Sequence, residues 1–465
     1  MDSKSQKTVI AVVLVLIFAG MMCCGGTLML GAWAGYDEAR KAESTKKTGG
    51  GVLDDDGDVG NADPFPDDPG PNGEDEDDKR AFAQAVLDEL EESGTSGYRY
   101  DPTRFELRTD GGVQLNLTNL YAEYNAAELD ERPGIVQRTV RAMSPPPVPE
   151  SWAEAAPQLK TAVRDRIYVE LIQLRTQGSK VVSRPLADDL VETVVFDGPD
   201  TMLYVSDEHL GKWGKTADEA LSRARANLMT ASNTRFTAVT PGVWESPWAD
   251  NFDTSRAALF DVIRKLKVKG EPVLFLPHRD HLIVTGSDDS RGLEAAIDLV
   301  DERLELPRAN TGRGWKLTAR GLEPWVPEDG SRAAFLRADA VRSDYNEQKS
   351  ALEARFDADG TDVFVGTVLE VEDDDEGVHQ YCVWTKGAQT LMPRAEYVVF
   401  VDLDKPEGKR VVAAARWEDV LSRMKDNVTE SDEYWPRRYR VEGFPDARTL
   451  RSLGTISWFV RNQGD

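Results

Sequence analysis

Residues 273–284 (VLFLPHRDHLIV) narrow the possible folds of this chain more than any other stretch. Two short apolar runs, 273–276 and 282–284, flank a polar insert. Apolar runs of this length, bounded by turn-forming residues, are typical of buried strands that meet in a hairpin. The insert consists of Pro277, His278, Arg279, Asp280 and His281. We therefore expect a buried hairpin with titratable groups of several kinds at its tip.

The length and charge of the chain limit its class. A chain of 465 residues exceeds the usual size of one hydrophobic core, so about two or three folded units are expected. The formal net charge is −26, and no basic stripe rises above this acidic background. Because a nucleic-acid backbone is itself negatively charged, we exclude nucleic acid as a partner.

Residues 8–33 form an uncharged, apolar run near the N-terminus. About 20 apolar residues are enough to cross a bilayer as a helix, which predicts an uncleaved single-pass membrane anchor within residues 1–36. Basic residues flank the run on both sides, with Lys4 and Lys7 before it. The side of the membrane therefore stays open, although a short basic tail kept inside favours an extracytoplasmic body.

Residues 37–78 have the composition of an acidic linker. Within them, 49–78 hold twelve Asp or Glu residues and no Lys or Arg, together with several Pro and Gly residues. A segment with this density of like charge cannot bury enough apolar surface to order itself. We predict a disordered, extended tether.

The rest of the chain alternates helices and hairpins. Apolar residues within 82–90 repeat at helical spacing, and Asp110-Gly111-Gly112 is a hairpin signal between alternating apolar residues. Because βαβ repeats are not evident, the pattern favours an α+β fold over a doubly wound sheet. The Gly- and Pro-containing segment 321–330 predicts a boundary between a domain at 79–322 and a smaller α+β domain at 331–465.

Several motifs in the middle of the chain share one order with a known family. They are Asn119-Leu120-Tyr121, the hairpin at 197–200, Leu210 with Trp213, Asn227-Leu228, Asp253-x-Ser255-Arg256-x-x-Leu259 and Pro277-x-Arg279-Asp280-x-Leu282. With these motifs, residues 82–322 resemble the YtpQ family, a bacterial domain of unknown function. The resemblance implies a bacterial α+β domain and gives no established activity. Together with the predicted anchor, it places the chain in a bacterial cell membrane.

The hairpin tip supplies most of the candidate site residues. Arg279 could clamp an anionic ligand, and His278 could act as a general base oriented by Asp280. The structural alternative is an Arg279–Asp280 ion pair that closes the turn. A zinc site needs three or four converging ligands, which one tight turn does not supply, so we predict no metal site and no cofactor.

Three further residues complete the candidate ligand-binding set. Arg256 follows Ser255 at the predicted start of a helix over 255–265, where a helix N-terminus can hold a phosphate or carboxylate. The plainer interpretation of Ser255 is an N-cap. Tyr121 and Asn227 join the set because they could line a cleft with the hairpin tip.

Two other features are interpreted structurally. Asp357-x-Asp359 matches the nucleophile motif of haloacid-dehalogenase phosphatases, but a charged helical segment precedes it where that chemistry needs a buried strand. We expect a turn between a helix and a strand at this point. Cys382 is the only cysteine outside the apolar N-terminal run, so it has no disulfide partner and is expected in a core.

Two functions fit these observations. The first is a membrane-anchored binding or interaction module that holds an unknown protein or small ligand without turnover. The alternative is a hydrolase that uses the His278–Asp280 turn, and the sequence leaves open whether the chain is an enzyme.

Overall fold

The computed structural model describes residues 73–109, 114–143, 148–175, 180–198, 202–307, 309–328, 330–373, 377–406, 409–453 and residue 456. The chain splits into two compact units, Met1–Pro146 and Pro147–Asp465. The division falls within a run of three prolines.

The described part of the first unit consists of three helices and a small antiparallel sheet. Its elements are α3 (Gly73–Glu92), β1 (Tyr98–Asp101), β2 (Glu106–Thr109), β3 (Gln114–Asn116), α4 (Thr118–Ala126) and α5 (Arg132–Met143). The predicted hairpin is confirmed, because Leu107 of β2 lies opposite Leu115 of β3. Helix α3 begins at Gly73, earlier than the start of order expected after residue 78, and it buries Phe82 in the core of this unit.

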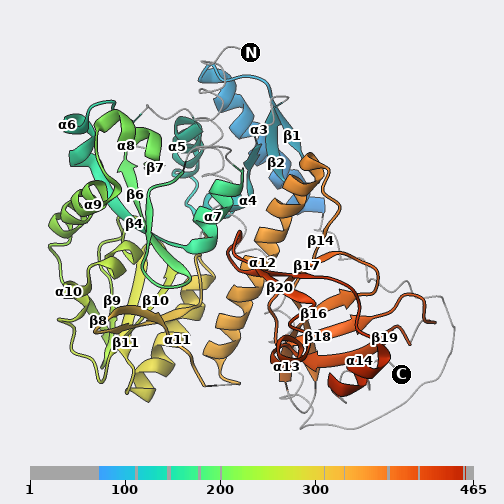
Figure 1. Ribbon diagram of the computed structural model, residues 1–465. Coiled ribbons are helices and arrows are strands. Elements are labelled where there is room, and N and C mark those ends of the chain that lie inside the picture. Colours follow the sequence, from blue (N-terminus) through green and yellow to red (C-terminus); the bar gives the residue numbers. More distant parts are fainter. Residues whose placement is uncertain are drawn as a thin grey trace, which may run out of the picture. The chain divides into compact units, whose positions relative to one another are not determined.

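The second unit begins with two antiparallel sheets and their covering helices (Figure 1). Its first elements are α6 (Trp152–Ala155), η1 (Ala156–Gln158), β4 (Leu159–Asp165), α7 (Arg166–Arg175), β5 (Ser183–Pro185), β6 (Leu190–Asp197), β7 (Met202–Tyr204), α8 (Asp207–Trp213) and α9 (Ala217–Ala231). Then follow β8 (Thr237–Thr240), β9 (Val243–Glu245), η2 (Thr254–Ala258), α10 (Phe260–Ile263), β10 (Pro272–His278), β11 (His281–Gly286), α11 (Ser290–Leu304), β12 (Gly314–Thr318) and β13 (Gly321–Pro324).

The predicted central hairpin is confirmed as β10 and β11. It forms the middle of a six-stranded sheet in the order β13-β12-β10-β11-β9-β8. Leu274, Leu276, Leu282 and Val284 alternate onto one face and pack with Trp315 in a buried core. Both apolar runs are fully buried because the sheet is covered on that face and on the opposite face, where α11 contacts β10 and β11.

The remainder of the second unit contains a long helix and two four-stranded sheets. Its elements are α12 (Arg332–Asp359), β14 (Phe364–Val365), β15 (Leu369–Asp373), β16 (Gly377–Thr385), β17 (Thr390–Pro393), β18 (Tyr397–Val401), β19 (Val411–Arg416), α13 (Trp417–Arg423), β20 (Val428–Ser431), β21 (Arg438–Val441) and α14 (Ala447–Leu453). The sheet orders are β15-β16-β18-β19 and β14-β17-β21-β20. Helix α12 contacts both α7 and β14, so it joins the earlier and later parts of this unit (Figure 1).

The predicted membrane-spanning helix is corrected. The longest described helices, α3 and α12, carry acidic and basic residues along their length, and within the described ranges no helix is both long and apolar enough to cross a bilayer. The predicted span, 8–33, lies outside the described residues, as does most of the predicted acidic linker. We therefore replace the predicted fold class, α+β with a transmembrane helix, by a mixed fold of helices and sheets. The single-pass anchor and the location in a bacterial cell membrane are withdrawn with it.

Candidate functional site

The polar insert lies at one end of the β10–β11 hairpin. His278 pairs with His281 across the turn, and Arg279 and Asp280 form the turn itself. A bulge interrupts the ladder between Phe275 and His278. The bulge changes the direction of the chain at the end of the apolar strand, and the imidazole of His278 is buried there.

Both ring nitrogens of His278 are engaged within the protein. The backbone N–H of Asp280 donates to Nδ1 at 3.2 Å, and Nε2 lies 2.9 Å from the carbonyl oxygen of Pro307. Because a carbonyl oxygen can only accept, Nε2 must carry the proton and the ring is neutral. Burial lowers the pKa of His278 to about 4. The ring has no open lone pair for a substrate proton, which does not favour a general-base role.

The pKa of His278 gives a direct test. A 13C-histidine-labelled chain has four imidazole signals, and we expect the His278 signal to titrate near pH 4 rather than near the ordinary 6.5. The folded state then binds fewer protons than the unfolded state between pH 4 and 6.5, so this group lowers stability as the pH falls through that window. His278→Asn assigns the signal, and a midpoint at or above 6 would contradict the buried neutral ring.

The Arg279–Asp280 turn docks on the loop between β9 and η2. Arg279 Nε lies 3.3 Å from Asp280 Oδ2, and Asp280 Oδ1 accepts the backbone N–H of Asn251 at 2.6 Å. Asn251 has φ +66°, a left-handed conformation that non-glycine residues adopt rarely. The backbone N–H of Thr254 donates to the carbonyl of Arg279 at 3.3 Å. These bonds fasten the turn to the loop, which is a structural role.

Arg256 is completely buried, and every nitrogen of its guanidinium has a partner. Nη1 and Nη2 each donate to one carboxylate oxygen of Asp250 at 2.8 Å, and Nε donates to Ser232 Oγ at 2.8 Å. The guanidinium carbon lies 4.0 Å from the centre of the Trp248 ring. Because the guanidinium is completely buried, none of its N–H groups is exposed to an anionic ligand.

The predicted helix over 255–265 is wrong. The segment forms the 3-10 turn η2 and then the short helix α10, because Leu259 between them departs from helical dihedrals with φ −92° and ψ 67°. The Ser255 hydroxyl is buried and accepts the backbone N–H of Val163 at 3.2 Å. Ser255 is thus neither an N-cap nor a phosphate ligand here; it ties η2 to β4.

Asn227 makes contacts that do not involve the tip residues, and Tyr121 belongs to the other compact unit. The Asn227 side-chain amide donates to the carbonyl oxygens of Ala156 and Leu159 at 2.8 and 2.7 Å, which fixes α9 to the start of β4. Tyr121 belongs to the first unit and packs its ring against Phe82. The structure therefore groups His278, Arg279, Asp280 and Arg256 around one loop and assigns Asn227 to a different contact.

The other sequence features have structural positions. Asp357 and Asp359 lie in the last turn of α12, which ends at Gly360 with φ +66°, as expected for a turn between helix and strand. Cys382 is buried in the core of the C-terminal sheets, and burial raises the pKa of its thiol. Within the described ranges, no group of three or more His, Cys, Asp or Glu side chains is arranged to hold a metal ion.

Sequence reasoning missed a buried charge cluster, here called the Arg313 cluster: Arg313, Asp165, Asp189 and Asp344. Arg313 Nη2 lies 2.5 Å from Asp344 Oδ2, whereas Nη1 is 3.9 Å from Asp165 Oδ2 and Nε is 3.7 Å from Asp189 Oδ2. Asp165 is the last residue of β4, Asp189 precedes β6, Arg313 precedes β12, and Asp344 lies on α12. Asp344 is one of the buried residues of α12, and its three partners lie far from it in sequence, so no short motif marks the cluster.

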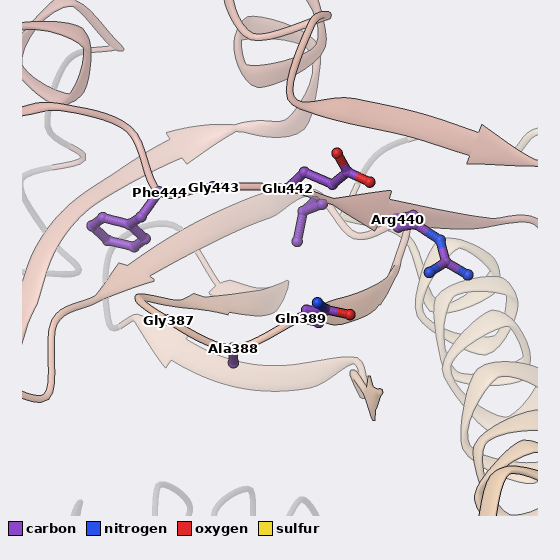
Figure 2. Close-up of a pocket in the computed structure, with 8 residues that line it drawn as sticks. Gly387, Ala388, Gln389, Arg440, Glu442, Gly443 and Phe444 are labelled. Carbon is purple, nitrogen blue, oxygen red and sulfur yellow. The ribbon is translucent and has the colours of Figure 1, made fainter. Parts of the chain in front are cut away.

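Sequence reasoning also missed a depression in the C-terminal part of the second unit, here called the β17–β21 depression. Its volume is about 440 Å³, and it is lined by Gly387, Ala388, Gln389, Arg440, Val441, Glu442, Gly443 and Phe444. Figure 2 shows Phe444 at one end and Arg440 at the other, with Glu442 between them and 387–389 on the opposite side. The depression begins where strands β17 and β21 diverge, beyond the last pair, Thr390 and Val441.

The backbone around this depression is held in place. Gly387 and Gly443 have φ +83° and +69°, which lets both segments turn away from the sheet. Trp384 Nε1 donates to the carbonyl of Gly443 at 3.2 Å, and Asn427 Nδ2 donates to the carbonyl of Glu442 at 3.0 Å. Hydrogen bonds from Trp384 and Asn427 therefore fix the backbone at 442–443, which positions the side chains that line the depression.

Comparison with known proteins gives no relative from which to assign this site. The chain matches no protein-family model, no curated protein and no solved structure. The resemblance of residues 82–322 to the YtpQ family stays a prediction.

Proposed function

We propose that this chain is a non-catalytic binding module and that the β17–β21 depression is its ligand-binding site. The observation that carries the proposal is that the charged side chains of the depression are exposed and form no ion pair with described residues. Arg440 and Glu442 line the depression, are exposed, and form no ion pair within the described residues. By contrast, the polar atoms of His278 and Arg256 are occupied by bonds within the protein.

The lining indicates the chemistry of the ligand. A cationic group, an anionic group and an amide are provided by Arg440, Glu442 and Gln389, and Phe444 adds an apolar surface. A ligand that fits this set carries both charges and an apolar group, as a short extended peptide does. Sites of a few hundred Å³ with a few placed polar groups are usual for ligands of this size, roughly 300–1,000 Å³. No observation favours the alternative of a hydrolase at the hairpin tip.

The proposal predicts binding of a doubly charged peptide. Acetylated and amidated Asp-Leu-Lys and Lys-Leu-Asp are mixed separately with the full chain, and saturation transfer to the leucine methyl groups is measured. We expect at least one of them to bind with a dissociation constant below about 1 mM, and the uncharged Asn-Leu-Gln to bind more weakly. Because the charges are exposed, Arg440→Gln or Glu442→Gln should weaken binding only roughly two- to fivefold.

A matched control is available on the same part of the chain. Arg448→Gln removes an exposed arginine of α14 outside the depression, and it should leave peptide binding unchanged. Absence of transfer from all three peptides would refute the depression as a peptide site. Equal affinity in wild type, Arg440→Gln and Glu442→Gln would show that the peptide binds elsewhere.

A further inference from the structure

The Arg313 cluster holds more negative than positive charge in a buried position. Three carboxylates face one guanidinium; Arg313 is 2% exposed, and the side chains of Asp344, Asp189 and Asp165 are 8%, 11% and 20% exposed. The guanidinium hydrogen-bonds to one of the carboxylates, Asp344, while its Nε and Nη1 atoms have no hydrogen-bond partner. Asp189 is held separately, since Trp315 Nε1 donates to its Oδ1 at 2.8 Å. Of the three carboxylates, Asp165 is therefore the one whose negative charge Arg313 compensates least.

Neighbouring cations make up the difference only in part: the charge of Arg164 opposes the raised pKa of Asp165, but each of these cations also bonds to another partner. Arg164, next to Asp165 on β4, donates to the Tyr204 hydroxyl at 3.2 Å. Arg166 lies 3.2 Å from Glu170, and Arg337 of α12 donates to the carbonyl of Trp325 at 3.4 Å. Ionisation of all three aspartates would thus place three negative charges around one buried guanidinium in a poorly solvated space.

Charge excess of this kind is relieved when one carboxyl keeps its proton. Burial, with the charges of Asp344 and Asp189, raises the pKa of Asp165 to about 7 against the opposing effects of Arg313 and Arg164. Burial also raises the pKa of Asp344. The cluster therefore gains a negative charge near neutral pH, at the point where α12 meets the ends of β4 and β6.

We propose that the Arg313 cluster is a pH-sensitive latch that holds α12 most firmly against the β4–β6 sheet at acidic pH and loosens as the pH rises through neutrality. The only one of its carboxylates on α12 is Asp344, and the other two belong to the sheet side. An added negative charge on Asp165 repels Asp344 across this junction. The ion pair between Arg313 and Asp344 is then opposed by two carboxylates instead of one.

The sign of the pH effect follows from the two states of Asp165. The folded protein keeps the proton up to about pH 7, whereas an unfolded aspartate releases it near pH 4. The folded state thus binds more protons between these values, so its stability falls as the pH rises and levels off above pH 7. For a folded pKa of about 7, opening that exposes Asp165 becomes about tenfold easier between pH 6 and pH 8.5.

Hydrogen exchange of the full chain measures this opening. Amide protection factors in α12 and β4, corrected for the intrinsic pH dependence of exchange, should fall about tenfold from pH 6 to pH 8.5 in wild type. Asp165→Asn keeps the size of the side chain and removes its titration, so protection at the two pH values should agree within about twofold. Asp261→Asn, at a side chain that is 85% exposed, should behave as wild type.

Two results would overturn the proposed latch. Protection of α12 that does not change with pH in wild type would overturn the latch, and this result needs no variant. A tenfold fall that persists in Asp165→Asn would place the pH dependence in another group and would equally overturn it. Peptide binding at the β17–β21 depression plays no part in this measurement, so failure of one proposal leaves the other intact.

Discussion

Replacement of Arg438 by alanine is expected to lower the free energy of unfolding of the second unit by about 3–5 kcal/mol. The Arg438 guanidinium is completely buried on β21. It donates to Gln348 Oε1 at 2.5 Å and to the carbonyl oxygens of Tyr345, Gly366 and Leu391 at 2.8, 2.6 and 3.2 Å. Alanine would leave these acceptors unsatisfied and open a cavity between α12 and the sheet.

The partners of Arg438 explain why the loss is large. Gln348 and Tyr345 belong to α12, and their side chains also bond to the carbonyl oxygens of Pro436 and Arg437 at 2.8 and 2.9 Å. One side chain thus connects α12, β17 and the chain just after β14 to β21. Burial lowers the pKa of Arg438 to about 10, but the group stays protonated at neutral pH and keeps all of its donors.

Urea unfolding of the full chain, followed by tryptophan emission, measures the effect. Trp384 and Trp417 lie in the adjoining core, so they report on this part of the molecule. Arg438→Lys should fall between wild type and Arg438→Ala, because a lysine keeps the charge but cannot reproduce the planar set of donors. Arg440→Ala, at an exposed arginine of the same strand, should change stability by no more than about 0.5 kcal/mol. A similar effect of both alanine substitutions would contradict the assigned role of Arg438.

Local pattern predicted the hairpin of β2 with β3, the hairpin of β10 with β11, and the helix within residues 82–90. The alternation of Leu274, Leu276, Leu282 and Val284 is imposed by the two faces of a strand, so it can be seen without knowledge of any distant partner. The helix predicted over 255–265 failed for the opposite reason. Tertiary bonds, such as that between the Ser255 hydroxyl and Val163 on β4, outweigh the helical pattern there.

The candidate site could not be predicted in the same way, because burial and pairing depend on residues far apart in sequence. A histidine beside an arginine and an aspartate suggests chemistry, yet the acceptor of His278 is the carbonyl of Pro307, which no motif marks. Likewise, Asp165 and Asp344 meet at Arg313 only after α12 has folded onto the sheet. The β17–β21 depression arises from the divergence of two paired strands, and only Gly387 and Gly443 hint at it.

Replacement of Arg256 by alanine is expected to lower the free energy of unfolding by about 3–5 kcal/mol, although the sequence pattern indicates Arg256 as a candidate ligand-binding residue. Its loss would leave the Asp250 carboxylate without its bidentate partner and the Trp248 ring without the cation that it covers. The loop that receives the Asp280 turn would then lose the contact that holds it, and Ala249 and Asn251 would no longer be kept at positive φ.

This result distinguishes a structural arginine from a ligand clamp. Removal of a binding-site arginine from a preformed pocket usually leaves stability unchanged or raises it, because such a charge is unpaired until the ligand arrives. Urea unfolding of Arg256→Ala, Asp250→Ala and the double variant gives their coupling, which should exceed about 1.5 kcal/mol for a buried bidentate pair. Arg291→Ala, at an exposed arginine of α11, serves as the control. A stable Arg256→Ala protein with no coupling to Asp250 would return Arg256 to the list of binding residues.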